Sequence, residues 1–371
     1  MIKFREYLKS IAATYKSAKS MDLQVCMGNV SADMDSIVGS LVLSFLLTQY
    51  EKMLTFPIIN CNKEELMFRF ETYHLLFSND LVSDLIYYNE SEIKLLMKNN
   101  KVGVVLFDHN VPDTNQQYLC ENVCMIMDHH ADYKKFQIKD ILIKQCGSCM
   151  SLAINKFESS IKDWDRSLAL LTISPILVDS DNFNPELKGG KWSDVDSYAY
   201  NILMAFLPGF NNDIYNQQIK KQKHDVKANL EIGVDNLLIK DYKNYQITEK
   251  YKYGSSVISI KPKTLIGHFG ADLVCAAMRK LMTTKDVNFY VLNCLCVDSH
   301  KKKREIICMS RSEKQLNKFV ELLMKYQEEL FLSKMDSRLV NCTMFKLKSA
   351  AITRKMLEPK FNDILSEVAS L

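Results

Sequence analysis

Four short segments of this chain gather acidic, imidazole and amide side chains directly after apolar runs. They read GNVSADMDS (28–36), FDHN (107–110), MDHHAD (127–132) and LVDSDNF (177–183). Carboxylates crowded into one place repel one another unless cations neutralise them, and hard divalent ions accept oxygen and imidazole ligands together. The segments therefore predict a metal site.

The first segment places two carboxylates two residues apart. Asp33 and Asp35 fall in a turn before a helix that Ser36 is predicted to cap. Side chains at this spacing can diverge toward two different ions. A pair of metals is therefore expected rather than a single one.

Three further residues would complete the ligand set. Asp108 follows a buried strand and can bridge the ions, His129 offers an imidazole, and Asp179 ends a later apolar segment. Two ions about 3.5–4 Å apart can activate water and clamp both the attacking and the leaving oxygens of a phosphoryl centre. The sequence has no nucleophile elbow and no Walker phosphate loop. Metal-assisted hydrolysis of a phosphoanhydride or phosphoester is the predicted chemistry.

Apolar segments of strand length must position these residues. LQVCM (23–27), VGVVLF (102–107) and VCMIM (123–127) are rich in β-branched and apolar side chains and alternate with helical patterns. This alternation indicates an α/β domain with a parallel sheet. In such a sheet the ligand site lies beyond the carboxyl ends of the strands, so the polar strand ends should converge.

A break in periodicity separates this domain from a second one. The segment 179–194 contains a Gly pair and a Pro, and it predicts a linker between a domain at 1–189 and another at 190–371. The second half is predicted to be mixed α+β, with a helical tract over 195–240, a helix near 271–283, and strands at 254–260, 288–297 and 304–310.

Composition excludes several classes of protein. A net charge of +4 over 371 residues is too balanced to indicate nucleic-acid binding, and the longest apolar runs are about half of the roughly 20 residues that a bilayer span needs. The 11 cysteines lack framework spacing, which indicates free thiols and a cytoplasmic location. The basic N-terminus also resembles a mitochondrial presequence, but Phe4, Leu8 and Ile11 at helical spacing favour a packed helix. The sequence does not indicate an oligomeric state.

Together these motifs resemble the DHH phosphoesterase superfamily. The resemblance is to the branch that holds the yeast-type cytosolic exopolyphosphatases, the prune proteins and the manganese-dependent family II inorganic pyrophosphatases. All four segments stand in the family's order. The resemblance implies a parallel-sheet DHH domain, a smaller mixed domain called DHHA2, and an active site in the cleft between them.

The resemblance also implies roles for individual residues. Asp33 would bind the first metal, Asp35 the second, and Asp108 both, while His129 and Asp179 would complete the second site and Asp128 would orient an imidazole by a hydrogen bond. His130 would face the substrate phosphate, joined by Lys243 from DYK (241–243), by Arg354 and Lys355 from TRK (353–355), and more loosely by Arg69.

One position distinguishes the members of this branch. The pyrophosphatases carry a His where this chain has Asn29, and the exopolyphosphatase-like members carry Asn. An amide oxygen would be a weak, harder ligand that makes Mg²⁺ acceptable beside Mn²⁺, with Co²⁺ also possible. The expected activity is therefore exopolyphosphatase, with pyrophosphatase, or prune-like hydrolysis of short polyphosphates or cyclic nucleotides, as the alternative. A RecJ-like nuclease and a non-catalytic interaction protein are the other classes considered.

Two further motifs have plainer interpretations. CGSC (146–149) has the spacing of a redox or zinc site, but Gly147 and Ser148 also match a helix start. KKKR (301–304) fits a solvated hairpin turn, or else extends a basic path for a long polyanion.

Overall fold

The computed structural model describes residues 3–298, 301–337, 339–347, 352 and 354–370, and these form two compact units, Met1–Gln222 and Lys223–Leu371. The unit boundary falls later than the expected position at residues 189 and 190. The reason is packing, because two helices after residue 190 bury side chains in the core of the first unit. These side chains are Ala199 and Leu203 of α8 (Asp194–Met204) and Ile219 of α9 (Asn212–Lys223).

The first unit is built on a parallel sheet with the strand order β3-β2-β1-β4-β5-β6. Its strands are β1 (Asp22–Met27), β2 (Thr55–Ile59), β3 (Ile86–Tyr87), β4 (Lys101–Phe107), β5 (Val123–Asp128) and β6 (Asp140–Ile143). The three strands predicted from the apolar runs are β1, β4 and β5. The chain moves outward in one direction from β1 and in the other from β4, so the loops after these two strands face a topological switch point.

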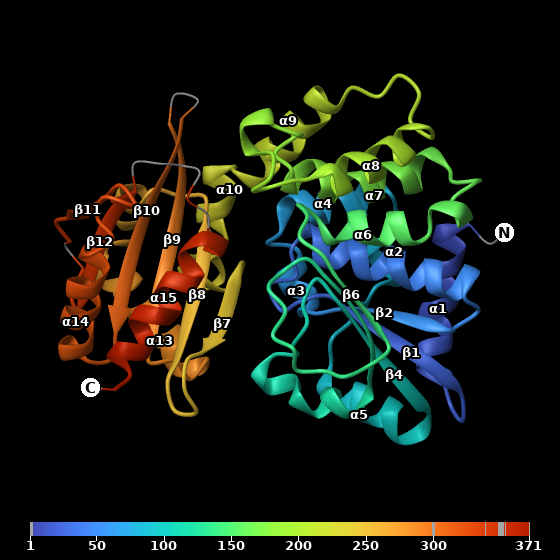
Figure 1. Cartoon of the computed structure of the whole chain (residues 1–371), viewed down its shortest axis with the longest axis horizontal. Helices are drawn as coiled ribbons and strands as arrows, with labels where there is room; N and C mark the ends of the chain where they lie inside the picture. The colour runs from blue at the N-terminus through green and yellow to red at the C-terminus, as the bar shows by residue number, and fades with distance from the viewer. Residues whose placement is uncertain (1–2, 299–300, 338, 348–351, 353, 371) are drawn as a thin grey trace. The chain divides into compact units, whose positions relative to one another are not determined.

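Helices cover this sheet (Figure 1). The helices of this unit are α1 (Phe4–Ser17), α2 (Met34–Tyr50), α3 (Lys63–Leu66), α4 (Phe70–Ser78), α5 (Glu90–Asn99), α6 (Cys149–Lys156), α7 (Arg166–Asp179), α8 and α9. Helices α1, α2, α5 and α6 contact the strands, and α7 and α8 pack on α2 and α6. Helix α1 buries Phe4, Leu8 and Ile11, as their spacing predicted. Helix α2 is buried over most of its length, which fixes the β1–α2 loop firmly at the sheet edge.

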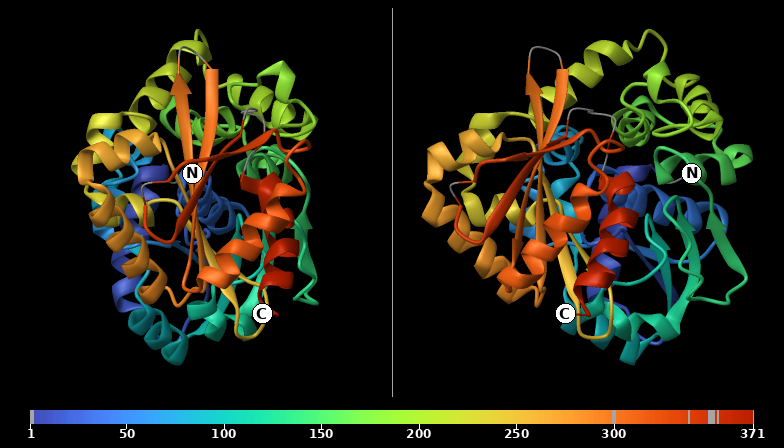
Figure 2. Two further views of the ribbon diagram at one scale, coloured as in Figure 1. Left: turned by 90° about the vertical axis from the view of Figure 1, so that its left-hand side faces the viewer. Right: turned by 60° about the vertical axis from the view of Figure 1, so that its left-hand side comes forward.

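The second unit is a mixed sheet with helices on both faces (Figure 2). The strand order is β11-β12-β10-β9-β8-β7, in which β8 and β9 are parallel and the other pairs antiparallel. The strands are β7 (Tyr242–Gln246), β8 (Lys252–Ile258), β9 (Phe289–Asp298), β10 (Lys301–Ser310), β11 (Leu332–Met335) and β12 (Cys342–Leu347). Helices α11 (Val234–Ile239), α12 (Pro262–Phe269) and α13 (Ala271–Thr284) pack on one face, and α14 (Glu313–Met324) and α15 (Arg354–Val368) on the other.

The tract over 195–240 is not continuous as predicted. It consists of α8, α9, α10 (Val226–Glu231) and α11. Gly209 and Gly233 interrupt it with φ values of 70° and 82°, a backbone conformation that side-chain-bearing residues seldom adopt. Among all the described residues, no helix has both the length and the apolar content to cross a membrane.

We predict that Gly39→Ala destabilises the first unit. A Cβ at this position of α2 would lie 1.9 Å from Cε1 of Phe107 at the end of β4. Overpacking of this kind costs about 1–3 kcal/mol of unfolding free energy, which urea denaturation would measure. Gly267→Ala in α12 is the matched control, because its Cβ meets nothing within 4 Å and a helical Gly→Ala change gains about 0.5–1 kcal/mol. Equal midpoints for Gly39→Ala and wild type would contradict this packing.

Candidate metal centre

The β1–α2 loop is held by close contact with its own helix. A Cβ on Gly28 would lie 2.6 Å from the Cβ of Ser36, so only glycine fits at the end of β1. Asp33, rather than the predicted Ser36, caps α2, because its Oδ1 accepts the backbone N–H of Ser36 at 3.0 Å. This leaves the Ser36 hydroxyl available for a contact further along the sheet edge.

Asp108 lies at the switch point, directly after β4. It adopts a left-handed conformation with φ of 61°, which turns the side chain away from the course of the strand. Its Oδ2 accepts the Ser36 hydroxyl at 2.6 Å and Nδ2 of Asn29 at 2.7 Å. Its Oδ1 lies 3.0 Å from Nε2 of His129 and 3.6 Å from Nδ1 of His130. The side chain is almost fully buried, so these neighbours define its surroundings.

Asn29 does not present its amide oxygen, which was predicted to be a weak metal ligand, to this site. The oxygen accepts the backbone N–H of Ser31 at 3.0 Å and also its hydroxyl. Since a backbone N–H can only donate, the amide nitrogen is the end that faces Asp108. Asn29 therefore acts as a donor to the carboxylate predicted to bridge the metals.

The Asp-His-His segment follows β5 and is ordered by its own acid. Asp128 Oδ1 accepts Nδ1 of His130 at 2.7 Å and the backbone N–H of His129 at 2.7 Å. Burial tends to raise the pKa of Asp128, but the hydrogen bond and charge of His130 lower it below the usual value. Asp128 therefore orients His130, whereas His129 is oriented by the carbonyl of Cys146, 3.1 Å from its Nδ1.

Asn110, a residue for which no role was predicted from the sequence, completes this arrangement. Its Nδ2 donates to Asp128 Oδ2 at 2.5 Å and to the carbonyl of Ala131 at 2.9 Å. Its Oδ1 accepts the backbone N–H of Tyr133. The signal that could have identified it is its place in FDHN, two residues after Asp108 at the same sheet edge.

The Asp108 carboxylate and the His129 imidazole face each other in a geometry that suits a cation between them. The carbonyl of Cys146 can only accept, so Nδ1 of His129 donates to it, and in a neutral ring the lone pair of Nε2 would face the Asp108 carboxylate oxygen at 3.0 Å. Two acceptors at this distance need a proton or a metal ion between them. Ligand atoms of Asp108, His129 and His130 all lie within 4.8 Å of one another, so these three residues could hold a divalent ion.

Asp35 approaches the same region from the first turn of α2. Its carboxylate accepts the Ser148 hydroxyl at 2.7 Å and the backbone N–H groups of Cys149 and Met150 at 2.6 and 3.1 Å. Burial first, and then the charges of Asp108, Asp179 and Asp33, raise the pKa of Asp35 well above 3.8. Four of the predicted acidic ligands thus lie close enough to affect one another's charge.

Asp179 is the last residue of α7 and precedes an unusual turn. Asp181, Asn182 and Phe183 are all left-handed, with φ between 53° and 59°. Asp181 forms an ion pair with Lys220 at 2.5 Å, and Asn182 donates to Asp213 at 2.6 Å. Contacts to α9 therefore fix the chain immediately after the predicted ligand.

The remaining predicted residues have separate surroundings. Arg69 is 3% exposed and donates to the carbonyls of Ser31 and Glu65, which favours a role in bracing the β1–α2 loop rather than binding substrate. In the second unit, Lys243 lies half-buried in β7 opposite Ser255, and Arg354 donates twice to Asp241 at 2.9 Å. Thr353 and the side chain of Lys355 lie outside the described residues.

The CGSC segment forms a helix start, as one of its two interpretations predicted. Ser148 is the N-cap of α6, and both thiols donate to backbone carbonyls, Cys146 to Ser148 and Cys149 to Met127. Burial, and then the charge of Asp35, raise the pKa of Cys149 well above its usual value. A thiol held protonated in this way is unsuited to redox or zinc chemistry.

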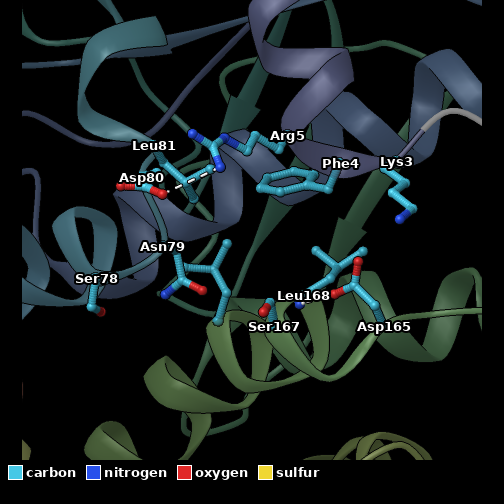
Figure 3. A pocket seen from close by; sticks show the side chains of 11 residues that line it. Lys3, Phe4, Arg5, Ser78, Asn79, Asp80, Leu81, Asp165, Ser167 and Leu168 are labelled. Carbon is cyan, nitrogen blue, oxygen red and sulfur yellow. Dashed lines mark hydrogen bonds and ion pairs between the residues drawn. The ribbon is translucent and has the colours of Figure 1, made fainter.

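A cavity of about 310 Å³ opens elsewhere in the first unit, away from these residues (Figure 3). The starts of α1 and α7 and the turn after α4 line it, and Arg5 and Asp80 form an ion pair at 3.2 Å within it. No predicted site residue is among its lining residues. The chemistry is therefore assigned to the sheet edge and not to this cavity.

The fold matches that of a solved structure. A crystal structure of a "putative family II inorganic pyrophosphatase" from Methanococcus jannaschii superimposes with a TM-score of 0.65 over 92% of this chain and 99% of that one, at 17% identity. No family model matches the sequence. The two-unit fold and the order of the motifs are similar to those of two-domain DHH-type phosphoesterases, in agreement with the resemblance noted from the sequence.

Several proteins with similar sequences are named as exopolyphosphatases. A protein of Schizosaccharomyces pombe named "Putative exopolyphosphatase" is 25% identical over 99% of this chain and 97% of its own length. The proteins named exopolyphosphatase PRUNE1 from Bos taurus and Homo sapiens are 29% and 28% identical over 64% of this chain. These matches cover 52% of the PRUNE1 proteins, so the chain corresponds to about half of their length.

We predict a specific pH dependence for the metal-free protein. Asp35 has a pKa in the folded state above 3.8, so folding favours its protonated form and its contribution to stability is lost as the pH rises through the folded pKa. The unfolding free energy of wild type relative to Asp35→Asn should therefore fall as the pH rises above 3.8, as measured by urea denaturation in a chelator. Saturating Mn²⁺ should reverse this trend in wild type. A difference that does not change with pH would contradict the charge crowding.

Proposed function

We propose that this chain is an exopolyphosphatase, which hydrolyses the terminal phosphoanhydride of inorganic polyphosphate and releases orthophosphate. The observation that supports this most is the facing pair of Asp108 and His129 at the switch point of the parallel sheet. Similarity over almost the whole chain to a protein named for this activity agrees with it. Inorganic pyrophosphatase, or a prune-like activity on short polyphosphates or cyclic nucleotides, is the alternative.

Two divalent ions, Mg²⁺ or Mn²⁺ with Co²⁺ as a further option, are the proposed cofactors. Their proposed ligands are Asp33, Asp35, Asp108, His129 and Asp179. When bound, such ions supply positive charge that polarises a phosphoryl group and activates water. Burial raises the pKa of Asp35 most, and the charges of Asp108, Asp179 and Asp33 raise it further; this crowding of carboxylates is the observation that favours more than one cation.

The chain's own residues hold this centre in place. Asn29 and Ser36 fix one oxygen of Asp108, so that the other points at His129. The carbonyl of Cys146 holds His129 in the tautomer whose Nε2 can bind a metal. Groups oriented in this way lose little freedom when ligands arrive, which favours catalysis by preorganisation.

Cationic and imidazole groups would bind the phosphates. His130, whose Nδ1 is held by Asp128, is the proposed imidazole contact of a phosphate oxygen. Lys243, Arg354 and Lys355 of the second unit are the proposed partners of the remaining phosphoryl oxygens. Arginine offers a planar fork and lysine a compact charge, so the set suits a polyanion.

Location and partners follow from the same features. The cysteines of the described residues are free thiols, which supports a reducing compartment such as the cytoplasm. Inorganic polyphosphate is the proposed partner, and neither nucleic acid nor a membrane is required.

A substrate panel tests the proposal. We expect Mg²⁺ or Mn²⁺ to support phosphate release from long-chain polyphosphate, and less or none from pyrophosphate and cyclic AMP, with tripolyphosphate as an intermediate length. Malachite-green detection of orthophosphate and chromatography of nucleotides are the measurements. Faster turnover of pyrophosphate than of every longer chain would favour the alternative, and cleavage of single-stranded DNA would indicate a nuclease.

Asp108→Ala should reduce turnover severely. This change removes the carboxylate that would contact both ions, and the loss of several kcal/mol of charge stabilisation corresponds to about a hundredfold or more in kcat. Cys120→Ala is the control, because its partly exposed thiol lies outside the carboxylate cluster. Near-full activity of Asp108→Ala at every metal concentration would disprove the assignment.

A further inference from the structure

The start of α6 is bound by two buried carboxylates from distant parts of the chain. The first amides of a helix lack partners within it and attract negative charge. Those of Cys149 and Met150 donate to Asp35, as described above. The two preceding amides, of Gly147 and Ser148, donate to Asp196 at 2.8 and 3.1 Å. Four consecutive N–H groups are thus divided between one acid from α2 and one from α8.

Asp196 is 0% exposed. Besides the two amides, its carboxylate accepts the Ser151 hydroxyl at 2.7 Å and the backbone N–H of Ser193 at 2.8 Å. The contact with Ser193 forms part of the capping box of α8. A buried carboxylate is tolerated only when donors surround it in this way, and most of these donors belong to the start of α6.

Gly147 shows how closely the segment before α8 approaches this turn. A Cβ on Gly147 would lie 2.5 Å from the carbonyl oxygen of Lys191 and 3.4 Å from Asp196 Oδ1. A residue with a side chain would separate the two segments. The turn that presents donors to Asp35 is therefore pressed against the segment that supplies Asp196.

We propose that Asp196 is a positioning residue for the metal centre, acting on Asp35 through the N-terminus of α6. By holding the amides of Gly147 and Ser148, Asp196 sets the place of the Ser148 hydroxyl and of the next two amides. These three donors fix both oxygens of Asp35. The inference rests on the metal-binding role proposed above for Asp35.

Asp196→Asn tests the proposal. The amide would place an NH₂ group against N–H donors, since each oxygen of Asp196 accepts from two or more of them. We expect the dissociation constant for Mn²⁺, measured by titration calorimetry, to rise about ten- to hundredfold. In metal-free protein, hydrogen exchange of the peptide 147–156 should accelerate. At saturating Mn²⁺, kcat should recover while the KM for polyphosphate is unchanged.

Controls separate positioning from general stability. Asp194→Asn changes an exposed acid in the same helical turn, one that pairs with Lys188, and should leave Mn²⁺ affinity unaltered. In an Asp35→Asn background, Asp196→Asn should add little to the loss of affinity, because both act through one carboxylate. If Asp196→Asn does not fold, Ser151→Ala removes a single donor and should raise the Mn²⁺ dissociation constant by a few-fold.

The outcomes distinguish this inference from the function itself. Folded Asp196→Asn with wild-type Mn²⁺ affinity and exchange, or fully additive losses in the double variant, would overturn the role of Asp196 alone. Absence of Mn²⁺ binding by wild type would instead overturn the proposed metal centre.

Discussion

Buried negative charge at the switch point of the first sheet is the constraint on which the structure depends. Asp35, Asp108 and Asp128 are almost wholly removed from solvent, and an unsatisfied carboxylate there would cost several kcal/mol. Each is accommodated by a different device: a helix start for Asp35, an amide and a hydroxyl for Asp108, and Asn110 with backbone amides for Asp128. The donors orient the acids but do not remove the cost of burying them together, because burial and then the neighbouring carboxylates still raise the pKa of Asp35.

The sequence predicted the positions of these acids because they depend on the order of strands. Apolar runs located β1, β4 and β5, and parallel strands bring their carboxyl ends to one edge. The hydrogen-bond partners of these acids could not be predicted from the sequence in the same way. Three contacts depend on which donor meets which acceptor in three dimensions. They are the cap of α2 by Asp33, the contact of the Asn29 nitrogen with Asp108, and the contact of Asn110 with Asp128. Residue type alone leaves those choices open.

The boundary between the two units shows a second limit of prediction from the sequence. Gly189 and Gly190 marked a turn correctly, but a turn is not a domain boundary. The apolar faces of α8 and α9 decide the matter, because Leu203 and Ile219 are buried in the first core. Turn-forming residues indicate where the chain changes direction, whereas the division into units depends on where each helix buries its side chains.

The pairing of α6 with acids from α2 and α8 has a consequence for how the protein is made. Contacts between residues far apart in sequence form late, since long loops must close first. During synthesis, α6 emerges from the ribosome before Asp196 does, and until α8 docks, half of the donors at its start have no carboxylate to hold them. The carboxylate cluster at this sheet edge can therefore reach its final geometry only after the first unit has been translated nearly to its end.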